Sequence, residues 1–420
     1  QLPVLTDEVI LRANATIENG CVAEAKKITF SGTPTPTLTI ADGGQLVTNT
    51  AVWATVQKVI NAHGATVEEG GWNFIASPIN SSSYSATSTG LNLITDNYGS
   101  NIPEGQTASY DLYSFLQNPT LDENGVGNEW RNYRKSTFSL ANGKGYLYAS
   151  LNGTTLNFTG SIKALPTTAS QAVSLTYAAE SELTDMSYRG WNLVGNPFTF
   201  DTYVNMSYYK MNEDGSAVEP VDAYQTTTIA PCTGIMVQAT ESDQSVTFSK
   251  EAPSSQTGNQ GNLNIALAQA NVRNNSIMDK AILSFNEGSQ LSKFYFGQNK
   301  ANIYFPQDNE PLAIVSSEGQ GEMPLNFKAY ENGSYTLSFG SQNASFNYLR
   351  LIDNLTGAEV DLLQTPSYTF NATTTDYESR FKLVFCTGVN DDSDSFAFCS
   401  NGNWIINNDG EAILHVLDVT

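Results

Sequence analysis

The sequence predicts an all-β protein of several domains, and three observations lead to this fold class. Short segments that alternate apolar and polar residues are separated by turn residues roughly every 8–12 positions, which is typical of β-strands. Helical periodicity is nearly absent. A nine-residue motif recurs together with its neighbours in the same order, which indicates an internal repeat. The 420 residues are enough for about two to four domains.

Residues 1–65 are predicted to form a short β-solenoid-like segment. ATIENG, KKITFSG and TLTIADGGQLV read as short strands that end on Gly or Asn, and Gly43 and Gly44 allow a tight turn after Asp42. Repeated strand–turn units favour stacked, β-helix-like coils, with an ordinary pair of hairpins as the alternative. The segment VWATVQKVI at 52–60 fits both a helix and a strand, and its β-branched residues favour the strand.

Residues 66–251 are predicted to form a β-rich domain that contains the repeat. GWNFIASPI at 71–79 matches GWNLVGNPF at 190–198, and GKGYLYAS at 143–150 is echoed by PCTGIMVQA at 231–239. TTLNFTG at 154–160 is echoed by QSVTFSK at 244–250, so the copies span 71–160 and 190–250. In each copy the Trp is expected to pack inward on a strand that a Pro ends, because Pro cannot donate to a sheet. The first copy holds a longer insertion with predicted strands at 109–115 and 129–135.

The rest of the chain is predicted as a linker, a β-sandwich and the start of a further domain. Residues 252–262 have no apolar periodicity and read as a linker. About eleven short strands in 263–386, the fifth and sixth of them beginning near 312 and 325, predict one β-sandwich. Residues 387–403 read as a second polar linker, and 404–420 as two strands around Asn408–Gly410. A Cys386–Cys399 disulfide is one alternative to four unpaired thiols.

The charge balance excludes several classes of partner. With 42 acidic and 20 basic residues the net charge is −22, which argues against nucleic acids and anionic membrane surfaces. No apolar run is long enough to span a membrane, so we expect no membrane insertion. Only 15% of residues are charged, and Ser, Thr, Asn, Gly and Tyr supply the polarity. We therefore expect a secreted or cell-surface protein whose signal peptide has been removed before Gln1.

Several segments of the chain resemble a family of secreted multidomain proteins of the Bacteroidetes that are exported by the type IX secretion route. The resemblance rests on GWNFIASPI, YDLYSF, EWRNY, GKGYLYA, GWNLVGNPF and the block at 348–385 (YLRLIDNLTG…YESRFKLVF). The ending GNWIINNDGEAILHVLDVT is similar to the first strands of the C-terminal sorting domain of such proteins, so 387–420 is expected to be a linker plus a truncated sorting domain. The resemblance implies an extracellular or cell-surface location, and it implies no single chemistry.

A search for catalytic and metal-binding residues gives no candidate. The two histidines, His63 and His415, have no nucleophile motif near them. The acidic residues are scattered, so no carboxylate pair stands out. Three oxygen-rich turns at 122–125, 212–215 and 390–394 were weighed as calcium sites, but none fits the EF-hand pattern and the first two read as hairpin turns. No C-x-x-C occurs, and no Gly-rich segment opens a helix, so we expect no metal and no cofactor.

The aromatic residues provide the candidate binding site. Trp130, Tyr133, Tyr208 and Tyr209 are predicted to bind ligand, because aromatic faces stack on sugar rings and anchor protein interfaces. The alternative, which the residue types favour, is that these side chains fill a core.

The function predicted from these observations is that of a non-enzymatic secreted or cell-surface protein in adhesion or in host or matrix interaction. Its partner would be an extracellular protein or a glycan. The alternatives are a carbohydrate-binding surface module and the accessory region of a secreted hydrolase.

Overall fold

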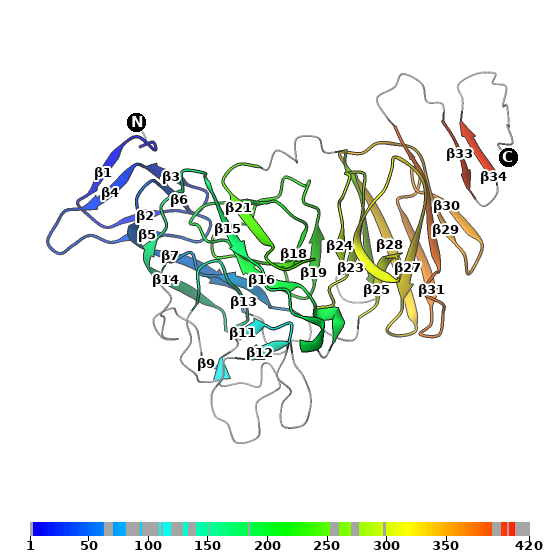
Figure 1. Ribbon diagram of the computed structural model, residues 1–420, viewed down its shortest axis with the longest axis horizontal. Coiled ribbons are helices and arrows are strands. Elements are labelled where there is room, and N and C mark those ends of the chain that lie inside the picture. The colour runs from blue at the N-terminus through cyan, green and yellow to red at the C-terminus, as the bar shows by residue number, and fades with distance from the viewer. Residues whose placement is uncertain are drawn as a thin grey trace. The chain divides into compact units, whose positions relative to one another are not determined.

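The computed structural model describes residues 3–62, 70–80, 93–94, 109–110, 112–118, 129–132, 140–150, 152–183, 185–252, 260–269, 277–296, 300–388, 396–400 and 403–407. Over these residues the all-β prediction is confirmed, with strands β1–β34 and two short 3-10 helices, Glu180–Glu182 and Met186–Tyr188 (Figure 1). The chain divides into two compact units, Gln1–Thr257 and Gly258–Thr420, and the division falls inside the predicted linker. Each unit has its own apolar core.

The first six strands form a short parallel β-solenoid of two coils. Each strand of the first coil pairs in parallel with its counterpart in the second: β1 with β4, β2 with β5 and β3 with β6. Hairpins give antiparallel pairs, whereas parallel neighbours need a longer crossover of chain between them, so the predicted coils are confirmed. The strands are β1 (Glu8–Leu11), β2 (Ala15–Ile17), β3 (Val22–Ala25), β4 (Lys27–Phe30), β5 (Leu38–Ile40) and β6 (Gln45–Thr48).

A glycine stands at the same corner of both coils, between the second and the third strand. Gly20 and Gly43 have φ values of 77° and 80°, in the left-handed region that favours glycine. The Gly20 amide donates to the Gly43 carbonyl at 3.0 Å, so the two corners lie one above the other. A Cβ on Gly44 would lie 2.5 Å from the Ile17 carbonyl oxygen. At Gly44 the coils therefore stack too closely for a side chain.

Strand β7 (Val52–Ile60) connects the solenoid to the repeat. It pairs in parallel with β5 and antiparallel with β14 (Thr154–Ile162), which gives a four-stranded sheet in the order β14-β7-β5-β2 (Figure 1). Alternate residues Val52, Ala54 and Val56 are buried in the core below this sheet. The strand predicted at 52–60 is therefore confirmed.

The two copies of the repeat fold into sheets with the same strand order. The first copy gives β12-β11-β13-β8 and the second gives β19-β18-β20-β16. Their strands are β8 (Asn73–Ala76), β11 (Leu112–Phe115), β12 (Trp130–Asn132), β13 (Gly145–Tyr148), β16 (Trp191–Gly195), β18 (Tyr208–Met211), β19 (Val218–Val221) and β20 (Gly234–Gln238).

The copies also share their pairing register. Ala76 lies opposite Gly145 in the β8–β13 pair, and the corresponding residues Gly195 and Gly234 lie opposite each other in the β16–β20 pair. A shift of the register by one residue would turn every side chain of a strand to the other face of the sheet. Because the two copies have the same register, corresponding residues point to the same face in both. The repeat seen in the sequence is therefore a repeat of the structure.

Each copy places a tryptophan beside a tyrosine. The ring centroids of Trp72 and Tyr113 are 5.7 Å apart in the first copy, and those of Trp191 and Tyr209 are 5.8 Å apart in the second. These distances lie in the range in which aromatic pairs attract each other. The conserved part of the GWN motif thus has a packing role in both copies.

The two copies meet through a pair of equivalent hydrogen bonds. The Ala76 amide donates to the Cys232 carbonyl and the Gly195 amide to the Gly143 carbonyl, both at 3.0 Å. Ala76 corresponds to Gly195 in the repeat and Gly143 to Cys232, so each copy gives the other the same contact, as across a pseudo-two-fold axis. A Cβ on Gly195 would lie 2.1 Å from the Ala76 Cβ, so the two backbones are in direct contact.

Each copy begins one strand earlier than its sequence motif. β7 pairs with β14 in the first copy, and β15 (Ser170–Ser174) pairs in the same way with β21 (Ser245–Ser249) in the second. β17 (Tyr203–Val204) also pairs with β21, and β9 (Leu93–Ile94) pairs with β10 (Ser109–Tyr110) within the insertion of the first copy. β7 and β15 take the same place in the two copies, as their pairing with β14 and β21 shows. The two strands do not share a sequence motif, so a comparison of motifs does not find them.

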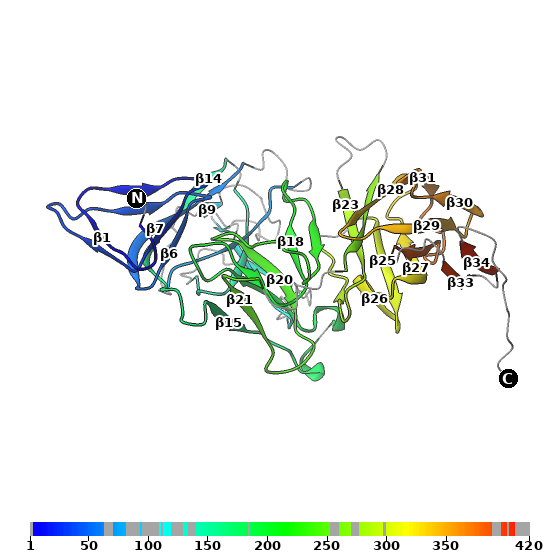
Figure 2. The same cartoon turned by 90° about the horizontal axis from the view of Figure 1, so that it is seen from above.

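The second unit is built on one sheet of 11 strands that curls on itself and nearly closes (Figure 2). Its halves face each other across one core, so the predicted sandwich is a single continuous sheet. The predicted strand at 293–296 is absent, since β24 ends before it. The strands are β22 (Asn262–Gln269), β23 (Ile277–Ser284), β24 (Leu291–Ser292), β25 (Asn302–Gln307), β26 (Glu310–Ser316), β27 (Gln320–Lys328), β28 (Gly333–Gln342), β29 (Phe346–Asp353), β30 (Ala358–Asp361), β31 (Ser367–Ala372) and β32 (Phe381–Thr387).

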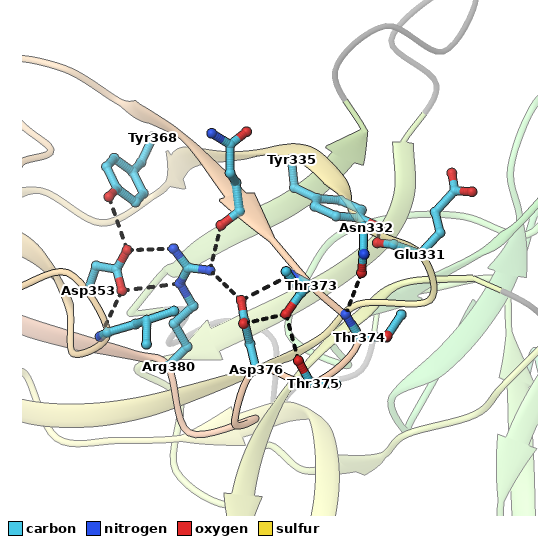
Figure 3. Close-up of polar contacts among 12 residues, drawn as sticks. Glu331, Asn332, Tyr335, Asp353, Tyr368, Thr373, Thr374, Thr375, Asp376 and Arg380 are labelled. Carbon is cyan, nitrogen blue, oxygen red and sulfur yellow. Dashed lines mark hydrogen bonds and ion pairs between the residues drawn. The ribbon is translucent and has the colours of Figure 1, made fainter.

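A buried arginine links β31, at one end of this sheet, to β29, the strand next to the other end (Figure 3). Arg380, just before β32, makes two hydrogen bonds to the Asp353 carboxylate at the end of β29, at 2.9 and 3.1 Å. It also donates to the Asn371 carbonyl of β31 at 2.9 Å and to Asp376 at 3.3 Å. The Tyr368 hydroxyl of β31 donates to the same Asp353 carboxylate at 3.1 Å. One guanidinium group thus binds a carboxylate of β29 and a backbone carbonyl of β31, and the Tyr368 hydroxyl joins the same two strands directly.

The charge of this group sets the protonation of its partner. Burial alone would raise the pKa of Asp353, but the hydrogen bonds and the charge of Arg380 outweigh it and lower that pKa below the ordinary value. The guanidinium carbon also lies 4.5 Å from the Phe370 ring centroid and 5.2 Å from that of Phe381. Such cation–π contacts add to the stability of a desolvated arginine.

A hairpin of β33 (Phe396–Ser400) and β34 (Asn403–Asn407) packs on the second unit. Ile405 contacts Val384 and Cys386 on the outer side of β32. The segment 387–403, predicted as a linker, therefore contains a strand, because its alternating Phe396 and Phe398 pair with the strand that follows. The strand predicted after Asn408–Gly410 lies outside the described residues.

Candidate functional site

A pocket of about 540 Å³ lies between the two copies of the repeat. One wall comes from the first copy, where β11 ends and β13 begins. The other wall comes from β15, β16 and the segment between them in the second copy. The lining residues are 115–118, 142–144, 173–174, 176–178, 182 and 191–194. The pocket thus depends on the contact between the copies and would not exist in one copy alone.

Gln117 joins the two walls. Its side-chain amide nitrogen donates to the Thr176 carbonyl at 2.7 Å and to the Trp191 carbonyl at 3.0 Å. Its side-chain oxygen accepts from the amides of Ala178 at 3.0 Å and Gly190 at 2.8 Å. All four bonds run from the first copy to the second, and the side chain is buried. Gln117 therefore fixes the shape of the pocket wall and has no capacity left for a ligand.

Asn142 leaves an unpaired acceptor in the pocket wall. Its side-chain nitrogen donates to the Ser77 carbonyl at 3.3 Å and to the Pro197 carbonyl at 2.9 Å, one in each copy. Its Oδ1 is buried and has no hydrogen-bond partner. A buried acceptor without a partner is costly, and this oxygen is covered by protein, so it is not a contact point for a ligand in the pocket.

The polar lining is mostly uncharged. The charged side chains among the lining residues are Lys144 and Glu182. Part of the Lys144 side chain is exposed, yet its ammonium is partly desolvated, which lowers its pKa. Its nitrogen lies 5.6 Å from the Tyr146 ring centroid. The lining residues include no His, Cys or Asp.

An aromatic cluster stands behind the wall of the first copy. The Phe115 ring lines the pocket and lies 5.2 Å from the Trp130 ring, and Trp130 lies 6.4 Å from Phe74. Tyr188 contacts Phe115 at 6.2 Å. Burial, together with the nearby charge and hydrogen bond of Glu129, raises the pKa of Tyr188 to about 12. These rings hold Phe115 in place at the edge of the pocket.

Of the four aromatic residues predicted as a binding site, the structure describes three, and it does not bring these three together. Trp130 is half-buried against Phe115, next to the pocket but not among its lining residues. Tyr133 lies outside the described residues. Tyr208 and Tyr209 are only 3% and 1% exposed, so the binding role predicted for them is wrong and the core alternative holds. Neighbouring residues on a strand point to opposite faces, and both faces of β18 are covered.

The turn at 212–215 uses its oxygens for its own hairpin. Asn212 Oδ1 accepts from the amides of Ser216 at 2.9 Å and Ala217 at 3.0 Å, and Asp214 Oδ1 accepts from the Ser216 amide at 2.9 Å. The turns at 122–125 and 390–394 lie outside the described residues, as do His63 and His415. Among the residues that the structure describes, no three His, Cys, Asp or Glu side chains gather as metal ligands.

The disulfide considered between Cys386 and Cys399 is not formed. Cys386 lies on β32 with a free thiol, and burial raises its pKa. Cys399 lies on β33, opposite Trp404 of β34. The two cysteines thus belong to different strand pairs.

The two residues that shape the pocket, Gln117 and Asn142, have only a weak signal in the sequence. Asn142 precedes Gly143, whose φ of 82° marks a turn, and that turn could have been predicted from the Asn-Gly pair. Gln117 follows a strand with no motif around it, and its partners come from a segment some sixty residues later. Contacts of this range follow from the pairing of the copies, which a local pattern does not report.

The chain has no match among family models, curated proteins or solved structures. No helix within the described ranges is long and apolar enough to cross a membrane. Any inference about function therefore rests on the residues of the site.

Proposed function

We propose that this protein is a non-enzymatic binding protein, secreted or held at the cell surface, which acts in adhesion by holding a sugar unit of an extracellular glycan in the pocket between the repeat copies. The observation that carries the proposal is the pocket lining, which combines amide and hydroxyl side chains with aromatic rings. Pockets of this size with a few placed polar groups are the usual form of small-ligand sites.

The chemistry of the wall suits an uncharged ligand that donates hydrogen bonds. The lining residues Asn118, Ser174 and Thr176 supply amide and hydroxyl groups, which can exchange hydrogen bonds with sugar hydroxyls. The edges of Phe115 and Tyr177 offer apolar contact to the faces of a pyranose ring. The net charge of −22 disfavours acidic glycans at long range.

The place of action is supported by composition. Few charges, many hydroxyl and amide side chains and the resemblance of the sequence to exported surface proteins all favour an extracellular site. The same binding would serve a carbohydrate-binding module or the accessory region of a hydrolase.

The test fills the pocket with a side chain from an exposed lining residue. Thr176 is exposed and lines the pocket, and Thr226 is exposed in the same unit outside it, so Thr176→Trp and Thr226→Trp form a matched pair. The intact protein is screened on an array of neutral glycans and titrated with the oligosaccharides that bind. We expect Thr176→Trp to lose at least about tenfold in affinity, roughly 1.4 kcal/mol, and Thr226→Trp to bind as the original protein does. Equal binding by both variants, or no binding to any glycan on the array, would contradict the proposal.

A further inference from the structure

We propose that the outer face of the sheet β14-β7-β5-β2 is a second binding surface, which takes a neutral polysaccharide chain laid across its strands. This sheet contains none of the residues that line the pocket. The proposal goes beyond the function proposed above, because the pocket holds a single sugar unit whereas this face would hold a polymer.

The centre of the face is a row of four threonines, one on each strand. Thr16 pairs with Thr39, Thr39 with Thr55, and Thr55 with Thr159, so all four stand in one register. Residues in register on neighbouring strands point to the same side, and strands lie about 4.8 Å apart. The buried alternate residues show which side is inward, so the threonines point outward. The row presents hydroxyl groups at a pitch close to the length of one sugar ring.

An exposed tryptophan flanks the row. Trp53 precedes Thr55 by two residues on β7, so it points to the same side, and it is 64% exposed. Val59, further along the same face, is 49% exposed. A tryptophan left in water on a flat sheet exposes a large apolar area, which is typical of an unoccupied binding surface. Its ring gives a sugar face a platform at one edge of the hydroxyl row.

The polar side chains of the face are held in place by one another. The hydroxyls of Thr55 and Thr159 are 2.8 Å apart, and Gln57 donates to Asn157 Oδ1 at 2.9 Å. The Asn157 nitrogen donates to the Thr155 carbonyl at 3.0 Å. Side chains that are already ordered lose less entropy when a ligand binds. Threonines are also restricted at χ1, which adds to this order.

The absence of charge on this face identifies the partner. None of the outward residues of the four strands, Thr16, Thr39, Trp53, Thr55, Gln57, Val59, Thr155, Asn157, Thr159 and Ser161, is charged. The chain as a whole carries −22, so an acidic polymer would be repelled and a basic protein would be drawn to the acidic residues elsewhere. A neutral polysaccharide matches a flat, uncharged array of hydroxyl, amide and aromatic groups.

The experiment measures binding of the intact chain to polymers. The probes are cellulose, mannan and a mixed-linkage β-glucan as neutral polysaccharides and polygalacturonate as the acidic one, with depletion from solution and affinity electrophoresis as readouts. We expect binding to at least one neutral polymer and none to polygalacturonate. Trp53→Ala should weaken that binding about tenfold, since the substitution removes the aromatic ring on which a sugar face would stack.

Two matched controls separate the face from a general effect. Trp404 on β34 is 53% exposed, so Trp404→Ala removes an equally exposed ring elsewhere. Thr336 and Thr369 form a hydroxyl pair at 2.9 Å on β28 and β31, so Thr369→Val matches Thr159→Val in kind. We expect Thr159→Val to weaken polymer binding several-fold and both controls to leave it unchanged.

The outcomes distinguish this surface from the pocket. Thr176→Trp should weaken the binding of small oligosaccharides and leave the binding of the polymer unchanged. Trp53→Ala should weaken the binding of the polymer and leave the binding of the oligosaccharides unchanged. Binding of polymer by Trp53→Ala at the original strength, or no binding of any neutral polymer by the folded protein, would overturn the inference even where the pocket proposal holds.

Discussion

Arg380 and Asp353 form an ion pair whose side chains are both about 1% exposed. Removing two charges from water costs about as much as their attraction returns, so such a pair is weak evidence of net stability. Removing only one partner is different, because the other is left buried and charged. The position therefore tolerates few substitutions, although the pair itself adds little net stability.

We expect Arg380→Ala to destabilise the second unit by about 3–5 kcal/mol. The control is Arg350→Ala, whose exposed guanidinium lies 3.8 Å from Glu359 and 4.0 Å from Asp361 and whose loss should cost less than about 1 kcal/mol. Hydrogen exchange of the β29 and β32 amides in the full chain measures both effects. Equal protection in the two variants would show that Arg380 does not hold β29 and β31 together.

Single residues also show where sequence-based prediction stopped. The sequence pattern around an aromatic residue on a strand is the same whether that face of the sheet is buried or exposed to solvent. Tyr208 and Tyr209 could therefore not be assigned to the core from the local pattern. Their burial depends on the elements that cover β18, and these come from the rest of the second copy. Trp53, in contrast, lies on a strand whose other face is apolar, and its outward position follows from the alternation alone.

Among the elements, β8 and β16 meet at the junction of the copies with no room for a further side chain. We expect Gly195→Ala to destabilise the first unit by about 1–3 kcal/mol, since the added Cβ would lie 2.1 Å from that of Ala76 and the backbones must move apart. Gly340→Ala is the control, because a Cβ there meets nothing within 4 Å. Urea unfolding of the full chain, followed by exchange at β16 and β28, compares the two. A neutral Gly195→Ala would mean that the junction is looser than the structure indicates.

The strands themselves were predicted better than their partners. Alternation and turn residues located most strands of the second unit, and the motif located β8, β13, β16 and β20. The repeated strand–turn units that end on glycine favoured stacked coils, and hence parallel strand pairing, in the first 65 residues. They did not exclude a pair of antiparallel hairpins. The contact between β8 and the second copy joins residues more than 150 positions apart, and no local pattern carries that information.

For the whole molecule, the separate cores predict separate unfolding. Over the residues that the structure describes, the large apolar clusters are two in the first unit and one in the second, with the predicted linker between the units. We expect calorimetry to resolve two transitions, because cooperative unfolding follows contiguous cores. Arg380→Ala should lower only one transition temperature and Gly195→Ala only the other. A single transition that both substitutions lower would contradict this division.

The outer face of the sheet β14-β7-β5-β2, with its row of threonines, can change in width if the number of parallel coils at the start of the chain changes. Stacked coils touch only their neighbours, so a coil can be gained or lost while the remaining coils keep their contacts. Each further coil would place one more strand beside β2 and widen the surface by about 4.8 Å. Point substitutions change how strongly such a surface binds, whereas the number of coils sets how many sugar units it can span. Affinity and reach would then be under separate genetic control.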